Sequence, residues 1–131
     1  MTSGLRNALL VGSGGFMGSV ARYLVTGWAT QVSHASRFPL GTLVVNVTGC
    51  LLIGLLAGVA EHAHLLSAPA RLFLLTGILG GFTTYSAFAY ETYFLGREHL
   101  LGAALANVAL QLVLGLSAVL VGSRLALAIA R

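Results

Sequence analysis

Residues 72–94 read LFLLTGILGGFTTYSAFAYETYF, an apolar run that carries a single charge. A helix needs about 20 residues to cross the hydrocarbon core of a bilayer, so this run is long enough to do so. Backbone amides in lipid must bond within their own segment, and we therefore expect a helix. A polar cluster at residues 80–86 lies at the middle of the run, where polar groups cost most. The run predicts a membrane helix with an unusual centre.

The centre of this run predicts a break in the helix. The paired glycines Gly80 and Gly81 each disfavour a helix by about 1 kcal/mol. The adjacent Thr83 and Thr84 can bond backbone carbonyls and relax the helical ladder. A broken helix frees carbonyl oxygens, which suit a hard cation such as Na⁺. The alternative is a packing notch of glycine and threonine in an unbroken helix.

Two aromatic residues, Tyr85 and Phe88, follow the cluster on one helical face. An aromatic ring has a negative face and a positive edge. Ring edges directed into a narrow path would stabilise a small anion weakly enough to let it leave, as conduction requires. Two aromatics at this spacing are also typical of core packing.

Three further apolar runs complete a single domain over residues 1–131, and we expect spans at about 8–28, 40–60, 72–94 and 100–122. The mean hydropathy is +0.93. Charged residues make up 8% of the chain, whereas a soluble domain carries roughly 25%. The first run is longer than the apolar part of a signal peptide, so we expect it to be retained. These features predict an all-α, multi-pass protein of the cell inner or plasma membrane, in contact with lipid.

The basic residues are all arginines, and they are scattered singly along the chain. They form no basic patch, which argues against a nucleic-acid partner. The two sides of the predicted bundle differ little in arginine content, so insertion in both orientations would permit an antiparallel homodimer; a bias of one charge that fixes one orientation is the alternative. A dimer is also expected because four packed helices fill their own centre. One side has Arg6, Arg71, Arg124 and Arg131, and the other has Arg37 and Arg97, with Arg22 near the end of the first span.

The first two long runs carry small and polar residues at helical spacing. Gly14 and Gly18 form a track on which another helix can lie close. Arg22 continues that face, and it either snorkels to the interface or attracts anions at a pore mouth. Thr42 and Asn46 share a face of the second span, where Asn46 either joins two helices or offers its NH₂ group to an anion.

The fourth run places Asn107, Gln111 and Gly115 on one face. A hydrogen bond from an amide side chain between membrane helices is worth only about 0.6–2 kcal/mol. A wet pathway between polar stripes therefore explains two amide side chains in one apolar helix more simply. The histidines and acids lie mostly at span ends, and we expect no enzymatic activity. Cys50 is expected to be a packing residue, without a disulfide framework or a cysteine metal site.

These motifs resemble the Fluc/CrcB family of fluoride channels. The matching pieces are GGxxGxxxRY at 14–23, PxGTLxVNxxG at 39–49 and GxxGGxTTYSxF at 77–88, and they occur in the family's order. The resemblance covers the whole four-span layout. It implies a fluoride-selective channel that passes F⁻ passively across the membrane and so lowers cytoplasmic fluoride.

The resemblance also implies an assembly and a set of site residues. The assembly is an antiparallel, dual-topology homodimer with a structural Na⁺ held by the backbone carbonyls of Gly80 and Thr83. The family usually has Phe where this chain has Tyr85, and often Tyr and Ser where it has Asn107 and Gln111. The implied fluoride pathway comprises Asn46, Tyr85, Phe88, Thr42, Thr84, Ser86, Asn107, Gln111 and Arg22.

Two other functions compete with the channel. A small proton-coupled multidrug exporter is also a four-span, dual-topology dimer, but it needs a carboxylate within the membrane. The first span has none, and Glu91 lies near the end of the third. A helical subunit that transports nothing would not explain the polar cluster at mid-membrane.

Overall fold

The computed structural model describes residues 3–33, 37–62 and 65–130, and every regular element in these ranges is a helix. Four helical segments are long and apolar enough to cross a membrane: α1 (Ser3–Val32), α2 (Leu40–His62), a third span (Ala68–Arg97) and α6 (Leu101–Ile129). The predicted all-α, four-span fold is confirmed, and the chain is a multi-pass membrane protein. Most helices extend beyond the predicted spans, because hydropathy marks the apolar stretch while backbone bonding continues into flanking polar residues.

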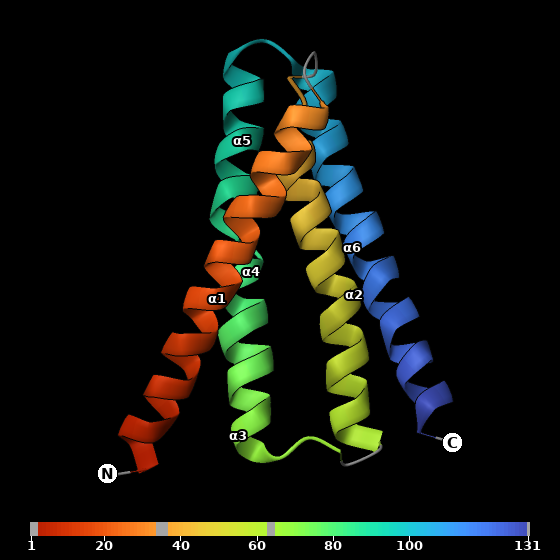
Figure 1. Cartoon of the computed structure of the whole chain (residues 1–131). Helices are drawn as coiled ribbons and strands as arrows, with labels where there is room; N and C mark the ends of the chain where they lie inside the picture. The colour runs from red at the N-terminus through yellow and green to blue at the C-terminus, as the bar shows by residue number, and fades with distance from the viewer. Residues whose placement is uncertain (1–2, 34–36, 63–64, 131) are drawn as a thin grey trace.

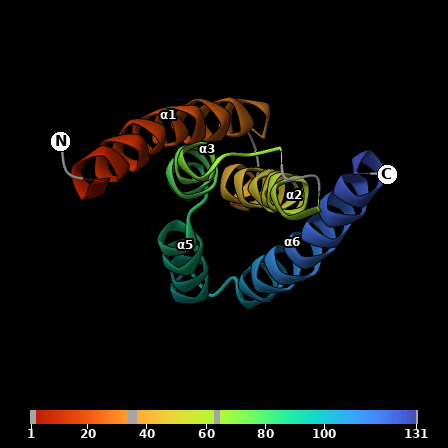
Figure 2. The same cartoon turned by 90° about the horizontal axis from the view of Figure 1, so that it is seen from below.

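The helices meet at one end of the bundle and diverge toward the other (Figure 1). The start of α1, the end of α2, α3 and the end of α6 lie at the divergent end, as the alternation of four spans requires. Seen along the bundle, α1 lies against the third span and α6 runs beside α2 on the other side (Figure 2). Of the arginines used to judge orientation, Arg131 lies outside the described residues.

Glycines set the close approach of α1 to the third span. A Cβ atom at Gly14 would lie 2.5 Å from the carbonyl oxygen of Phe73, and one at Gly18 would overlap the carbonyl oxygen of Ile78. The predicted small-residue track is therefore confirmed, and the helix that lies on it is the third span. Both obstacles are backbone atoms, which cannot move aside as a flexible side chain can.

A second glycine contact joins α2 to α6. A Cβ atom at Gly54 would overlap the carbonyl oxygen of Val119, and one at Gly122 would overlap that of Leu51. These contacts fix the depth and rotation of α6 relative to α2. They thereby decide which polar residues of the two helices face each other.

The third span consists of α3 (Ala68–Arg71), a π-helical segment η1 (Leu72–Leu79), α4 (Gly80–Phe82) and α5 (Tyr85–Arg97). Thr83 and Thr84 are extended, with φ/ψ of −79°/159° and −152°/118°. The predicted break in the helix is confirmed. The alternative interpretation, an unbroken helix with a glycine and threonine packing notch, is therefore excluded. The break falls midway along the span.

The glycines before the break have a different role from the predicted one. Gly80 is helical, with φ −63° and ψ −37°, and a Cβ atom there would have no neighbour closer than 4.0 Å. Gly81 also lies within α4, and a Cβ atom there would overlap the carbonyl oxygen of Gly15. Gly81 serves packing against α1, and within the third span the backbone leaves the helix at the two threonines.

Candidate functional site

Two side chains hold the break open by taking amide hydrogens from the helical ladder. The Thr84 N–H donates to Oδ1 of Asn46 at 2.8 Å, and the Ala87 N–H donates to Oγ1 of Thr84 at 3.3 Å. In an unbroken α-helix these two amides would bond the carbonyls of Gly80 and Thr83, four residues earlier. The structure thus releases from that ladder the carbonyls of Gly80 and Thr83, the two that the family resemblance implies as cation ligands.

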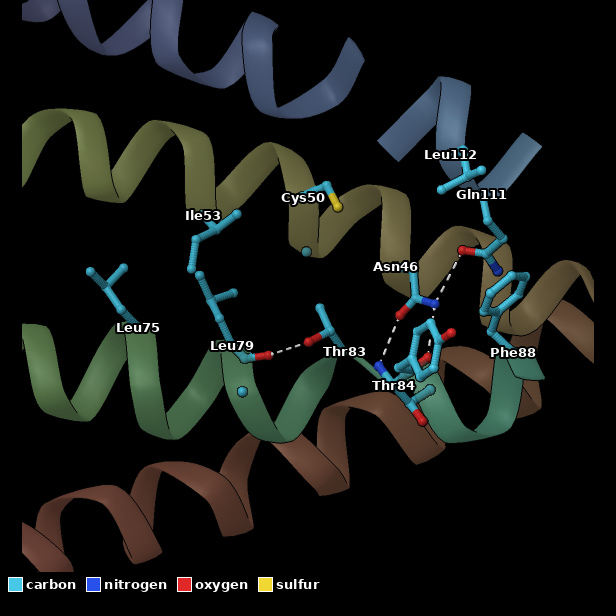
Figure 3. Close-up of a pocket in the computed structure, with 13 residues that line it drawn as sticks. Asn46, Cys50, Ile53, Leu75, Leu79, Thr83, Thr84, Phe88, Gln111 and Leu112 are labelled. Atoms are coloured by element: carbon cyan, nitrogen blue, oxygen red, sulfur yellow. Dashed lines mark hydrogen bonds between the residues drawn. The ribbon is translucent and has the colours of Figure 1, made fainter. Parts of the chain in front are cut away.

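Asn46 joins three parts of the fold (Figure 3). Its Oδ1 accepts from the Thr84 N–H. Its Nδ2 donates to the Thr84 carbonyl at 3.0 Å and to Oε1 of Gln111 at 3.1 Å. The amide therefore ties α2 to the break and to α6. Both Nδ2 hydrogens have a partner within the chain, which favours the interpretation of Asn46 as a residue that joins helices.

A cavity of about 390 Å³ lies between α2, η1, the break, α5 and α6 (Figure 3). Most of the predicted site residues line it: Asn46, Gly80, Thr83, Thr84, Tyr85, Phe88 and Gln111. The remaining wall is mainly apolar: Gly49, Cys50, Ile53, Leu75, Leu79 and Leu112. Sequence reasoning did not assign these wall residues to the site, although Gly49 and Cys50 follow Asn46 at helical spacing.

The two aromatic rings at the cavity contact each other edge to face. The centroids of Tyr85 and Phe88 are 5.6 Å apart, with an interplanar angle of 64°. Phe88 is half-buried, whereas Tyr85 is 79% exposed. The two rings share a helical face, as expected, but the chain does not enclose them.

Four predicted pathway residues lie outside the cavity lining, and two of them, Thr42 and Asn107, are buried. Thr42 is buried and donates to Oε1 of Glu91 at 2.6 Å. Asn107 is fully buried and donates to Oγ1 of Thr92 at 2.9 Å. Glu91 and Thr92 were not assigned to the site from sequence, although they follow Phe88 at i+3 and i+4. These bonds attach α2 and α6 to α5 beside the cavity.

Arg22 and Ser86 lie next to the break. Arg22 is partly buried, and its Nη1 donates to the Thr83 carbonyl at 3.3 Å. Its guanidinium is thus directed to one of the released carbonyls. Ser86 is exposed, with its hydroxyl 3.4 Å from Oγ1 of Thr84.

Three buried side-chain atoms have no hydrogen-bond partner among the described residues: Oε2 of Glu91, Oδ1 of Asn107 and Nε2 of Gln111. Gln111 is the one residue of these three that lines the cavity, and Nε2 is a donor. No group of three or more His, Cys, Asp or Glu side chains in the described ranges could hold a metal ion.

The family model described as CrcB-like protein, Camphor Resistance (CrcB), matches residues 9–123. The chain belongs to the CrcB family. It is 47% identical over 108 residues to a protein of Methylobacillus flagellatus, covering 82% of this chain and 84% of that one. A protein of Agrobacterium fabrum is 42% identical over 116 residues, 88% of this chain and 92% of its own. A protein of Clostridium perfringens is 40% identical over 119 residues, which cover 91% of this chain and 92% of that protein. All three are named fluoride-specific ion channel FluC.

The stretch that matches the CrcB family contains every residue that lines the cavity. That lining has polar and aromatic groups but, in the part of the chain that the structure describes, no charged side chain. Such a lining can offer hydrogen bonds and partial charges to an ion without binding it through a full opposite charge.

Proposed function

We propose that this CrcB-family protein is a fluoride-selective channel that passes F⁻ passively down its electrochemical gradient and lowers cytoplasmic fluoride. The observation that carries the proposal is the cavity at the helix break, which brings an aromatic pair and an unpartnered amide donor together. The identity of the ion is inferred from the relatives, which are named fluoride-specific ion channels. The protein is a channel and not an enzyme.

The chemistry of the lining suits transient binding of a small anion. Fluoride needs strong hydrogen-bond donors in place of its water, and a neutral amide can provide them. The positive edges of Tyr85 and Phe88 add partial charge. Because no fixed cation lines the cavity, the ion is held weakly enough to leave, which conduction requires.

Proton-coupled export is the less suitable function for this site. It needs a carboxylate that binds protons on the transport path. Glu91 is the carboxylate inside the third span, but it bonds to Thr42 and does not line the cavity. The geometry therefore favours passive anion passage.

Ion efflux from vesicles tests this function directly. Purified protein in liposomes loaded with potassium fluoride should release F⁻ once valinomycin lets K⁺ follow, and a fluoride electrode measures the release. Chloride-loaded liposomes are the control and should retain their anion. Drug uptake driven by a pH gradient would instead support an exporter, and no transport of either kind would support a structural subunit.

The assembly that we propose is an antiparallel, dual-topology homodimer in the inner or plasma membrane. Its first support is the incomplete protomer, because Tyr85 at the cavity is 79% exposed. Its second support is the small difference in arginine content between the two ends of the bundle. A second copy of the chain would cover the exposed ring and close the pathway.

A structural Na⁺ belongs to the same proposal, and the released carbonyls of Gly80 and Thr83 are the groups that would hold it. Their usual amide partners are bonded to Asn46 and Thr84, so these oxygens are available as hard ligands. Arg22 opposes the cation, since its guanidinium already donates to the Thr83 carbonyl. That oxygen has two lone pairs and can serve both. When bound, the ion would supply positive charge at the break. The breaks of two facing copies of the chain would offer about four oxygens, a low count for a hard cation.

A density map of the purified protein in sodium chloride should show two antiparallel protomers and one peak between the two Thr83 segments. The peak should weaken in a matched map recorded with N-methyl-D-glucamine chloride. A parallel dimer or a monomer would contradict the dual topology. Unchanged density in the absence of Na⁺, or no density there in either map, would contradict the sodium site and leave the fluoride function to be judged by efflux.

A further inference from the structure

We propose that the end of the bundle where the helices meet binds a phospholipid whose headgroup carries a primary ammonium, with Arg37 holding its phosphate and Glu98 its ammonium. The site is a second cavity of about 290 Å³, lined by Arg37, Phe94, Leu95, Glu98 and Leu100. That volume is close to the lower end of the roughly 300–1,000 Å³ typical of ligand pockets. The cavity shares no residue with the one at the helix break, so this inference does not depend on which ion the protein conducts.

The first step is the position of this cavity at the edge of the membrane. Glu98 and Leu100 lie between the third span, which ends at Arg97, and the fourth, which begins at Leu101. Arg37 lies between the first two spans. The end of α1, the start of α2 and the α5–α6 turn all lie where the helices meet (Figure 1). A span ends where the hydrocarbon core gives way to the headgroups, so the cavity lies at headgroup depth.

The second step is the turn between α5 and α6, which builds an apolar wall. The Leu100 N–H donates to the Leu95 carbonyl at 2.9 Å, and the His99 N–H donates to the Gly96 carbonyl at 3.2 Å. Together with the left-handed backbone of His99, at φ 60°, these bonds form a Schellman motif. The motif brings Leu95 and Leu100 together, and both line the cavity. Glu98, the cap residue of α5, is thereby held beside this wall by backbone bonds.

The third step concerns the two charged side chains. Arg37 and Glu98 are exposed, and within the described ranges neither side chain forms a hydrogen bond or an ion pair. They line one cavity without bonding each other, so a ligand that satisfies both carries a negative group and a positive group. A phosphate suits the guanidinium, which can bind two of its oxygens at once, and an ammonium donates its hydrogens to the carboxylate.

The apolar surface beside the cavity favours a lipid over a soluble molecule with the same charges. Phe94 is 49% exposed whereas Leu95 is buried, so apolar surface runs from the outside of α5 into the cavity. One turn nearer the middle of the membrane, the exposed ring of Tyr90 stacks with Phe94, with centroids 6.5 Å apart. We expect an acyl chain to follow this surface. Anionic phospholipids fit less well, because their headgroups bring no positive group to Glu98.

Native mass spectrometry of the purified protein tests the headgroup directly. The protein is mixed with equal amounts of phosphatidylethanolamine, phosphatidylcholine and phosphatidylglycerol that have identical acyl chains. The phosphatidylethanolamine adduct should exceed each of the others about tenfold or more, because choline has no N–H to donate to Glu98 and glycerol has no cation. Equal binding of the ethanolamine and choline lipids, or a preference for phosphatidylglycerol, overturns the proposal.

Two variants separate the two ends of the headgroup. Glu98→Ala should lower phosphatidylethanolamine binding about tenfold and abolish its advantage over phosphatidylcholine, whereas Arg37→Ala should weaken all three lipids. Both side chains are exposed, so both variants should fold, which size-exclusion chromatography checks. Glu61→Ala and Arg71→Ala remove the same charges at the divergent end and should bind as the wild type does. Phosphatidylethanolamine binding by either cavity variant within twofold of wild type overturns the proposal. The comparison of headgroups on the wild type decides the matter if a variant does not fold.

Discussion

We expect Asn46→Asp to abolish fluoride efflux while the protein keeps its wild-type oligomeric state. Aspartate retains the acceptor for the Thr84 N–H but loses the donors to the Thr84 carbonyl and to Gln111. Gln111 would then turn its own N–H groups toward the new carboxylate and away from the cavity. Like charges about 4 Å apart near a protein surface repel by ~4 kcal/mol, which corresponds to roughly a thousandfold loss of flux.

Size-exclusion chromatography alongside the efflux assay separates lost conduction from lost folding. Asn7→Asp is the matched control, because it adds the same charge in the first turns of α1, away from the cavity. Glycines set the close approach of α1 to the third span and of α2 to α6, so the variant should fold although it loses the bond from Asn46 to Gln111. Normal flux per folded Asn46→Asp protein would contradict the role of this amide.

The second large effect is expected from Gly18→Val, which should strongly destabilise the folded state. A Cβ atom at this position overlaps the carbonyl oxygen of Ile78 and lies 2.8 Å from the amide nitrogen of Phe82. The obstacles are backbone atoms, so α1 would have to move away from the third span. We expect a cost at or above the ~3 kcal/mol upper end of ordinary overpacking.

Gly12→Val is the matched control for Gly18→Val. The same side chain is added on the same helix, but nothing lies within 4 Å of a Cβ atom at Gly12. The midpoint of thermal unfolding, followed by circular dichroism in detergent, should fall sharply for Gly18→Val and stay near wild type for Gly12→Val. Equal midpoints would show that the glycine track does not hold α1 in place.

The spans and the break were predictable because they follow from local properties of the chain. Four apolar runs of this length are typical of membrane-spanning helices. Threonine is a typical residue at the start of a helix, as Thr84 is at the start of α5. The π-helical form of η1 was not predictable, since hydropathy does not distinguish one helical hydrogen-bond pattern from another. The role of Gly81 was also missed, because it depends on contact with Gly15 in a distant segment.

The residues of the site were predictable as types, but their partners were not. Asn46 and Gln111 were expected near one pathway from their places on two helix faces. That they bond to each other depends on the depth of α6 against α2, which Gly54 and Gly122 set through contacts invisible in sequence. For the same reason Asn107, one turn from Gln111, was expected in the pathway but is buried against Thr92.

The interruption of the third span also divides its helix dipole. The continuous helical segment of η1 and α4 ends at Phe82 with a partial negative charge, and α5 begins at Tyr85 with a partial positive charge. Opposite half-charges therefore meet within a few residues, at a depth where a continuous helix would present neither. Anions are favoured on the Tyr85 side of the interruption and cations on the Phe82 side. One short stretch of backbone thus offers neighbouring places of opposite polarity without using a single ionised side chain.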